Sequence, residues 1–276
     1  MKYIAHIKSA ILFCLVCCTL LTACSSSLNL GSGNGNSSQI TLNVFAGSSL
    51  TESFNEIANS YHTLHPNVTV QFNYGGSQNL VRQIKNGANC DIFASADFIN
   101  MKKASDAGLV KHSQVFVKNK QVVIVPITNA AGIHSLHDLT KKGIKLDLAA
   151  DVVPAGTYTR KILANMSMSP EYGSSYKSKV LANVVSEEDE VKAVVQKIQL
   201  NEADAGFVYQ SDVTPSVANK VIVITIPNNF NVIAQYPIAT VKSSKYPKEA
   251  QDFMNYILSN VGQTVLKKHN FIPVNQ

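Results

Sequence analysis

The stretch that decides the fold is residues 41–64, TLNVFAGSSLTESFNEIANSYHTL. Residues 41–47 are mostly apolar and rich in strand formers, which predicts a buried strand. A helix is predicted after the small residues that follow, because apolar side chains recur on one helical face. These side chains are Phe54, Ile57, Ala58, Tyr61 and Leu64. The stretch therefore encodes a strand, a short turn and an amphipathic helix.

The turn in this unit carries the signature of a helix start. Ser49 and Glu52 have the spacing of a capping box, in which the hydroxyl and the carboxylate satisfy free amides of the first turn. We therefore expect these two side chains to cap the helix. Asp97 is expected to cap a later helix, and Gly87 and Gly108 are expected to end helices.

The alternation of strand and helix continues along the chain. Further strands are predicted at 68–74, 91–95, 121–126, 144–150, 180–185, 205–209, 221–226 and 236–241. Further helices are predicted at 80–84, 98–107, 157–166, 188–200, 247–258 and 262–268. This order is typical of an α/β fold with parallel or mixed sheets and helices on both faces.

Two such sets indicate two sheets, because about 237 residues make a long chain for one core. Helices at both ends of the α/β region suggest that the C-terminal segment returns to the first lobe. We expect one lobe to comprise residues 39–120 and 236–276, and the other to comprise residues 121–235. The crossings near 121–125 and 235–241 would form a hinge between them.

The N-terminal segment has the features of an export signal. Lys2 and Lys8 precede an apolar run at 10–21 that is too short to span a bilayer. The run ends in LTAC, which resembles the lipobox of bacterial lipoproteins and implies acylation of Cys24. We expect a signal peptide at 1–23, a lipidated flexible tether at 24–38, and a location in the periplasm or at the cell surface. A signal without lipid and a buried N-terminal helix are the alternatives.

Composition narrows the class of protein. Hydrophobic residues make up 45% and charged residues 15%, which argues against disorder and against a protein with many membrane spans. The net charge of +6 falls to +4 without Lys2 and Lys8, because 22 basic residues then face 18 acidic ones. The basic residues are scattered and have no interleaved aromatic residues, so we expect no nucleic-acid partner. After loss of the signal and lipidation of Cys24, Cys90 is the one remaining cysteine, and it is expected to be a small buried residue.

Three turns of small residues lead from strands into helices and could bind an anion. They are AGSSLT at 46–51, GGSQNL at 75–80 and VPAGTY at 153–158. Free amides, hydroxyls and the positive end of a helix are available at such turns. Ordinary helix caps and loops are the alternatives. The acidic stretch at 186–191 is typical of a plain first turn of a helix.

Six segments together resemble a known family, the periplasmic molybdate-binding proteins of ABC importers. They are VFAGSSLT (44–51), NYGGSQNLVRQI (73–84), DIFASAD (91–97), VPAGTYT (153–159), DEVKAVV (189–195) with NEADAGFVYQSDV (201–213), and YPIATV (236–241). The match covers residues 40–273. The resemblance implies a two-lobed periplasmic-binding-protein fold of type II, each lobe a mixed sheet flanked by helices.

The resemblance also implies a function and a site. A tetrahedral oxyanion, molybdate or tungstate, would lie between the lobes and pass to a membrane permease. Its ligands would be the hydroxyls and amides of Ser49 and Ser77, the amides of Ala155 and Val191, and the phenol of Tyr209. No cofactor is expected, the metal would be bound only as the oxyanion, and the protein is expected to be a monomer.

The chemistry of this site agrees with the anion. A fully ionised oxyanion offers only acceptors, so a site of neutral donors suits it. Each hydrogen bond to a charged group is worth about 1.5–3 kcal/mol, so several convergent donors suffice without a cation. Arg82 and Arg160 lie five residues beyond Ser77 and Ala155, respectively, so on a helix they are expected to point away from the cleft. Glu190 is expected to face solvent, because pointing inward it would repel the anion.

Other functions find less support in the sequence. Sulfate or phosphate could replace molybdate as the ligand. A surface hydrolase using Ser49 or Ser77 would need a nearby histidine and an acid. A structural lipoprotein with a vestigial cleft is a third possibility. The sequence has no hydrolase, protease or phosphate-loop motif, so we do not expect an enzyme. The pairs His62–His65 and His134–His137 are expected to be solvated rather than to bind a metal.

Overall fold

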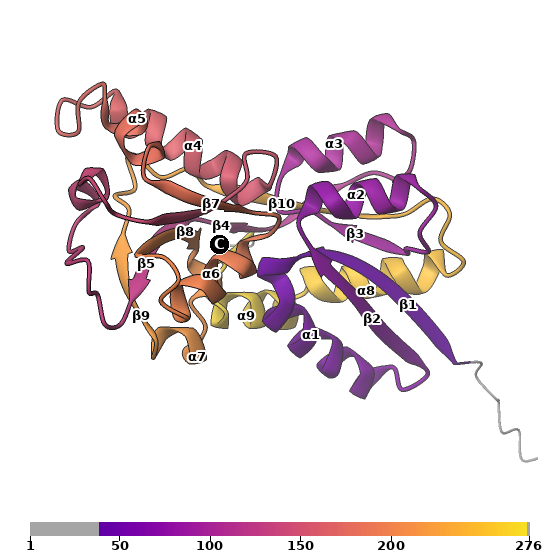
Figure 1. Cartoon of the computed structure of the whole chain (residues 1–276). Coiled ribbons are helices and arrows are strands. Elements are labelled where there is room, and N and C mark those ends of the chain that lie inside the picture. Colours follow the sequence, from indigo (N-terminus) through magenta and orange to yellow (C-terminus); the bar gives the residue numbers. More distant parts are fainter. Residues whose placement is uncertain (1–38, 275–276) are drawn as a thin grey trace, which may run out of the picture. The chain divides into compact units, whose positions relative to one another are not determined.

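The computed structural model describes residues 39–274 (Figure 1). The predicted signal peptide at 1–23 and the predicted lipidated tether at 24–38 lie outside the described residues. Within the described part of the chain, no helix is both long and apolar enough to cross a membrane. Two separate sheets form the body, one in each of two lobes.

The first lobe is built on a mixed sheet of six strands. They are β1 (Ile40–Gly47), β2 (Val68–Gly75), β3 (Ile92–Ala94), β4 (Gln114–Asn119), β10 (Ala234–Thr240) and β11 (Ile272–Pro273). Their order is β11-β4-β10-β3-β1-β2. Strand β1 runs parallel to β2 and β3, whereas β10 runs antiparallel to β3 and β4.

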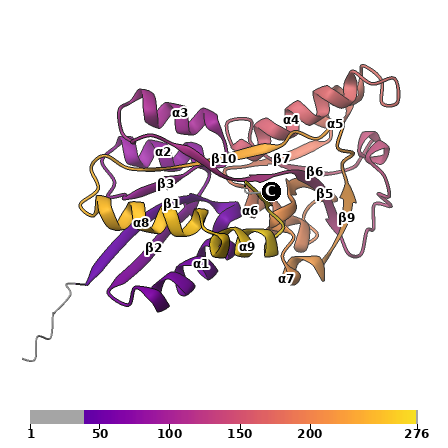
Figure 2. The same cartoon turned by 180° about the vertical axis from the view of Figure 1, so that it is seen from behind.

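Helices cover both faces of this sheet, because β1 is apolar on both. They are α1 (Thr51–Leu64), α2 (Ser77–Lys85), α3 (Phe98–Asp106), α8 (Pro247–Leu258) and α9 (Asn260–Lys268). Val44 and Ala46 pack in a core with residues of α1 and α8, and the intervening Phe45 packs with residues of α2 and α3. Figures 1 and 2 show α2 and α3 on one side of the sheet and α1, α8 and α9 on the other.

The second lobe contains a mixed sheet of five strands. They are β5 (Gln121–Pro126), β6 (Leu146–Ala149), β7 (Val184–Glu188), β8 (Ala205–Tyr209) and β9 (Val221–Thr225), in the order β7-β6-β8-β5-β9. Its helices are α4 (Pro154–Ser167), α5 (Tyr176–Leu181), α6 (Val191–Gln199) and α7 (Pro215–Ala218). Strand β6 is parallel to β7 and β8, and β5 is antiparallel to β8 and β9.

The chain passes between the two sheets at two places. The first is Lys120, which separates β4 from β5, and the second is the segment 226–233 between β9 and β10. The C-terminal segment packs on the first lobe, because α9 contacts α1 and β11 pairs with β4 at Ile272 and Lys118. Gly87 and Gly108, with φ of 88° and 69°, follow α2 and α3 as predicted, and the Asp97 carboxylate accepts from the Asn100 amide to cap α3.

Three local expectations were wrong or incomplete. The predicted strand at 180–185 begins only at Val184, because Val180 belongs to α5, where Tyr176 and Val180 bury one helical face. Leu64 does not join the core of α1 but is 64% exposed at its last turn. Strand β4 was not predicted, although Phe116 and Val117 are fully buried in it.

Candidate functional site

Residues of both lobes line one pocket in the cleft, and all five predicted ligand residues are among them. The empty space of the pocket, including the part that is open to solvent at its mouth, is about 210 Å³. Its lining residues are Gly47, Ser48, Ser49, Gly75, Gly76, Ser77, Ala96, Val153, Pro154, Ala155, Val191 and Tyr209. The fold therefore brings together residues that are up to 162 positions apart in the chain.

Ser49 comes from the turn after β1, but it does not cap α1 as predicted. The chain enters α1 through a 3-10 turn at Ser48–Leu50, and neither turn nor helix has a side-chain cap. Ser49 lies inside this helical turn and not before it, so its hydroxyl does not accept from an amide of α1. The hydroxyl instead lies 3.0 Å from the Tyr236 hydroxyl. Glu52, the other half of the predicted capping box, binds Lys192.

Ser77 is the first residue of α2 and is almost fully buried. Its hydroxyl oxygen accepts a hydrogen bond of 3.0 Å from the Ala96 amide. Because that amide can only donate, the hydroxyl hydrogen of Ser77 remains available to an acceptor in the pocket.

The second lobe contributes two helix starts. Helix α4 begins at Pro154 and helix α6 begins at Val191, and neither has a side-chain cap. Ala155 and Val191 lie in the first turns, where amides have no intrahelical partner. With α2 from the first lobe, three helix N-termini meet at the pocket, and each carries a partial positive charge.

Tyr209 ends β8 and is 1% exposed. Its phenol oxygen has no hydrogen-bond partner among the described residues. Burial raises the pKa of this phenol well above its ordinary value, so the group stays protonated and can donate. A buried donor without a partner is costly, and a ligand in the pocket would satisfy it.

No charged side chain lines the pocket. Arg82 donates to Asn79, and Arg160 binds backbone carbonyls of its own lobe and the Glu187 carboxylate. Neither arginine is among the lining residues, as the sequence predicted. The attraction for an anion would therefore come from hydroxyls, amides and helix ends.

The expectation that Glu190 faces solvent was wrong. Glu190 is half-buried, and its carboxylate accepts a hydrogen bond from the Ser48 hydroxyl of the other lobe. Burial raises the pKa of Glu190, and the Ser48 hydrogen bond opposes this rise. Glu190 lies outside the pocket lining, so its carboxylate joins the lobes rather than entering the site.

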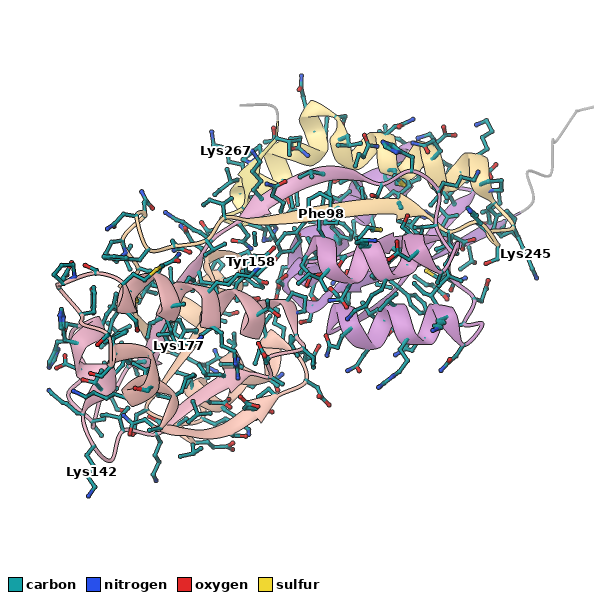
Figure 3. The ribbon with its side chains drawn as sticks, turned by 90° about the horizontal axis from the view of Figure 1, so that it is seen from above. Phe98, Lys142, Tyr158, Lys177, Lys245 and Lys267 are labelled. Carbon is teal, nitrogen blue, oxygen red and sulfur yellow. The ribbon has the colours of Figure 1, made fainter. Side chains whose placement is uncertain are left out.

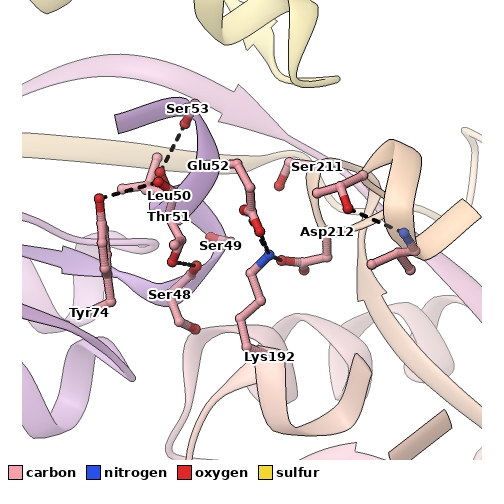
Figure 4. A network of polar contacts seen from close by, with 12 residues as sticks. Ser48, Ser49, Leu50, Thr51, Glu52, Ser53, Tyr74, Lys192, Ser211 and Asp212 are labelled. Carbon is pink, nitrogen blue, oxygen red and sulfur yellow. Dashed lines mark hydrogen bonds and ion pairs between the residues drawn. The ribbon is translucent and has the colours of Figure 1, made fainter. Parts of the chain in front are cut away.

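Two further contacts join the lobes beside the pocket. Lys192 is next to Val191. Its Nζ lies 2.8 Å from a carboxylate oxygen of Glu52 in the first lobe and 3.8 Å from a carboxylate oxygen of Asp212 (Figure 4). The Gln78 side chain of the first lobe donates to the Asp189 carbonyl at 2.9 Å. Burial raises the pKa of Asp212 to about 6, and the charge of Lys192 opposes this rise.

The sequence alone did not reveal the bridging role of these residues or the contact of Tyr236 with Ser49. Lys192 and its partner Glu52 are 140 positions apart, and Tyr236 is 187 positions from Ser49. No local pattern marks such pairs, although Tyr236 lies in a segment, YPIATV, that contributed to the family resemblance.

The pocket and its surroundings offer little for catalysis or metal binding. Neither Ser49 nor Ser77 is hydrogen-bonded to a histidine or a carboxylate in the described structure. Residues 39–274 contain no group of three His, Cys, Asp or Glu side chains that could hold a metal ion. Cys90 is buried, and burial raises the pKa of its thiol to about 12, which disfavours a nucleophilic thiolate.

Comparisons with known proteins identify relatives of this chain. Residues 42–272 match the family model described as bacterial extracellular solute-binding protein. The molybdate-binding protein ModA of Mycobacterium tuberculosis H37Rv is 33% identical over 91% of this chain and 92% of its own length.

Solved structures share the fold. A substrate-binding domain assigned to a molybdenum ABC transporter of Clostridium difficile is 30% identical, with a TM-score of 0.64 over 85% of this chain and 99% of that one. The sulfate-binding protein SubI of Mycobacterium tuberculosis H37Rv has a TM-score of 0.77 over 86% of this chain and 88% of its own, at 16% identity.

Proposed function

The chain belongs to the bacterial extracellular solute-binding proteins, and from this premise we propose that it captures molybdate, and tungstate as well, for an ABC importer. The predicted two-lobed fold of type II periplasmic binding proteins is confirmed. The observation that carries the proposal is the lining of the pocket, which combines hydroxyl donors with three helix N-termini and has no charged side chain.

The ligand would be held by Ser49 and Ser77 from one lobe, and by Ala155, Val191 and Tyr209 from the other. An anion that accepts hydrogen bonds from both lobes stabilises the closed arrangement over the open one. The lobes, residues 39–120 with 236–276 and residues 121–235, would rotate about the two crossings. The protein makes and breaks no covalent bond when it binds and releases the anion.

Delivery requires a membrane partner and a location outside the cytoplasm. We infer that an ABC permease recognises the closed form and receives the anion. The protein would be exported by residues 1–23, would be anchored through lipid on Cys24 and a tether at 24–38, and would act as a monomer. Mass spectrometry of the membrane fraction tests the acylation of Cys24 directly.

Thermal unfolding with a panel of anions tests the function. Molybdate and tungstate at a hundred times the dissociation constant should each add about 2.7 kcal/mol of stability. Sulfate and phosphate at the same concentrations should add little. Stabilisation by none of these anions, or by sulfate or phosphate alone, would contradict the proposal.

Serine variants test the site by calorimetric titration. Ser49→Ala and Ser77→Ala should each weaken molybdate binding by about 10- to 100-fold, since each removes a hydrogen bond to a charged group. Ser53→Ala is a matched control, because Ser53 is equally buried but donates to the Leu50 carbonyl and does not line the pocket. Unchanged affinity in both test variants would refute this assignment.

A further inference from the structure

A chain of hydrogen bonds runs from Asn119 through Tyr236 to Ser49, and neither Asn119 nor Tyr236 lines the pocket. The Tyr236 hydroxyl lies 3.0 Å from the Ser49 hydroxyl, and Asn119 Nδ2 lies 3.4 Å from the Tyr236 oxygen. The same Nδ2 donates to the Ser211 hydroxyl of the second lobe at 2.9 Å. Asn119 and Tyr236 are both fully buried, so water does not compete for these hydrogen bonds.

The orientation of the Asn119 amide is fixed by the backbone. The Lys120 amide donates to Asn119 Oδ1 at 2.9 Å. A backbone N–H can only donate, so the atom facing it must be the oxygen of the side-chain amide. The other end, Nδ2, must then face Tyr236 and Ser211 as a donor.

This orientation fixes the direction of the remaining hydrogen bonds. The Tyr236 oxygen accepts from Asn119, and its buried hydrogen still needs an acceptor. Among the described residues the one acceptor within hydrogen-bond distance is the Ser49 oxygen. Ser49 therefore accepts from Tyr236, and its own hydrogen is left for a ligand in the pocket. The Ser77 hydroxyl is likewise left with its hydrogen for a ligand, because its oxygen accepts from the Ala96 amide.

We propose that Asn119 and Tyr236 are positioning residues that fix Ser49 as a hydrogen-bond donor and thereby disfavour anions that retain a proton. The proposal rests on the proposed oxyanion function of the pocket. A protonated anion needs an acceptor, and a Ser49 hydroxyl that turned to accept would lose its donor role. Molybdate has no proton at neutral pH, whereas arsenate, which is also tetrahedral, keeps one.

Tyr236→Phe tests this relay, the chain of hydrogen bonds from Asn119 through Tyr236 to Ser49, because it removes the hydroxyl and keeps the ring. Molybdate affinity should fall by about 2- to 10-fold, the worth of one neutral hydrogen bond. Affinity for arsenate should not fall in parallel, so the molybdate-to-arsenate ratio should decrease. An equal loss for both anions, or no loss for either, would overturn the proposal.

Asn119→Asp tests the direction of the relay. A carboxylate at this position would accept from Tyr236, so Ser49 would donate to Tyr236 and present a lone pair to the ligand. Molybdate affinity should then fall further than in Tyr236→Phe. Charge repulsion alone would act equally with or without the Tyr236 hydroxyl, so the loss caused by Asn119→Asp should shrink in the Tyr236→Phe background.

A second double-mutant cycle separates positioning from general damage to the fold. In a Ser49→Ala background, Tyr236→Phe should cause no further loss of molybdate affinity, because there is no hydroxyl left to position. An additive loss in that background would overturn the relay. Absence of molybdate binding by the unmodified protein would instead refute the proposed function, so the two failures are distinguishable.

Discussion

Tyr209→Phe should change stability and affinity in opposite directions. The Tyr209 hydroxyl is buried, lacks a partner among the described residues, and lines the pocket. Removing it relieves the cost of burying an unsatisfied polar group, about 1–3 kcal/mol. Without ligand, the free energy of unfolding of the variant should therefore exceed that of the unmodified protein by up to about 3 kcal/mol.

The same substitution removes one donor to the anion. Molybdate affinity should fall by about 10- to 100-fold, since a hydrogen bond to a charged group is worth about 1.5–3 kcal/mol. Urea unfolding without ligand measures the first effect, and calorimetric titration measures the second. A destabilised variant, or one with unchanged affinity, would refute the assignment of Tyr209 as a ligand residue.

Tyr158→Phe provides a matched control. Tyr158 lies at the boundary between the lobes (Figure 3), and its ring is 6.5 Å from that of Tyr209. Its hydroxyl has a partner, the backbone amide of Gln235, and it does not line the pocket. This variant should lose stability because the Gln235 amide is left unpaired, and its molybdate affinity should not change.

Three further variants test the contacts between the lobes. Lys192→Met should lower the free energy of unfolding in urea by about 1–3 kcal/mol, because buried Asp212 and the partly exposed Glu52 lose their cation; unchanged stability would contradict the role of this ion pair. Gly76→Ala should weaken molybdate binding in calorimetry, because the added methyl would overlap the Asp189 carbonyl oxygen across the cleft; normal affinity would show that the lobes close differently. Burial raises the pKa of Asp212 to about 6 in the folded state, above about 4 in the unfolded chain, so its contribution to stability falls as pH rises between these values. The stability of Asp212→Asn relative to the unmodified protein should accordingly rise by about 2 kcal/mol from pH 4 to pH 7, and a flat or opposite trend in urea unfolding would exclude this effect.

Local patterns predicted most of the framework. The strands predicted at 121–126 and 205–209 have these bounds in the structure, because compact apolar runs between turns leave little choice of conformation. The turns at Ser49, Ser77 and Ala155 could be expected at one cleft, since helices in α/β folds start at the carboxyl ends of strands.

What the sequence did not reveal depends on residues distant in the chain. Whether Ser49 caps a helix depends on the entry of the chain through a 3-10 turn and on Tyr236 from another strand. Glu190 was expected in solvent because a carboxylate pointing into the site would repel the anion, and its partner Ser48 belongs to the other lobe.

The return of the C-terminal segment has a consequence for biosynthesis. The second sheet is made entirely from residues 121–225, whereas the first sheet needs strands from both sides of that segment. Strand β4 forms ladders with β10 and β11, which are synthesised more than a hundred residues later. A chain that emerges N-terminus first can thus complete its second lobe while the first still has unpaired strand edges. The inserted lobe would fold first, and the surrounding lobe would be the part that most needs protection from aggregation until its last strands are made.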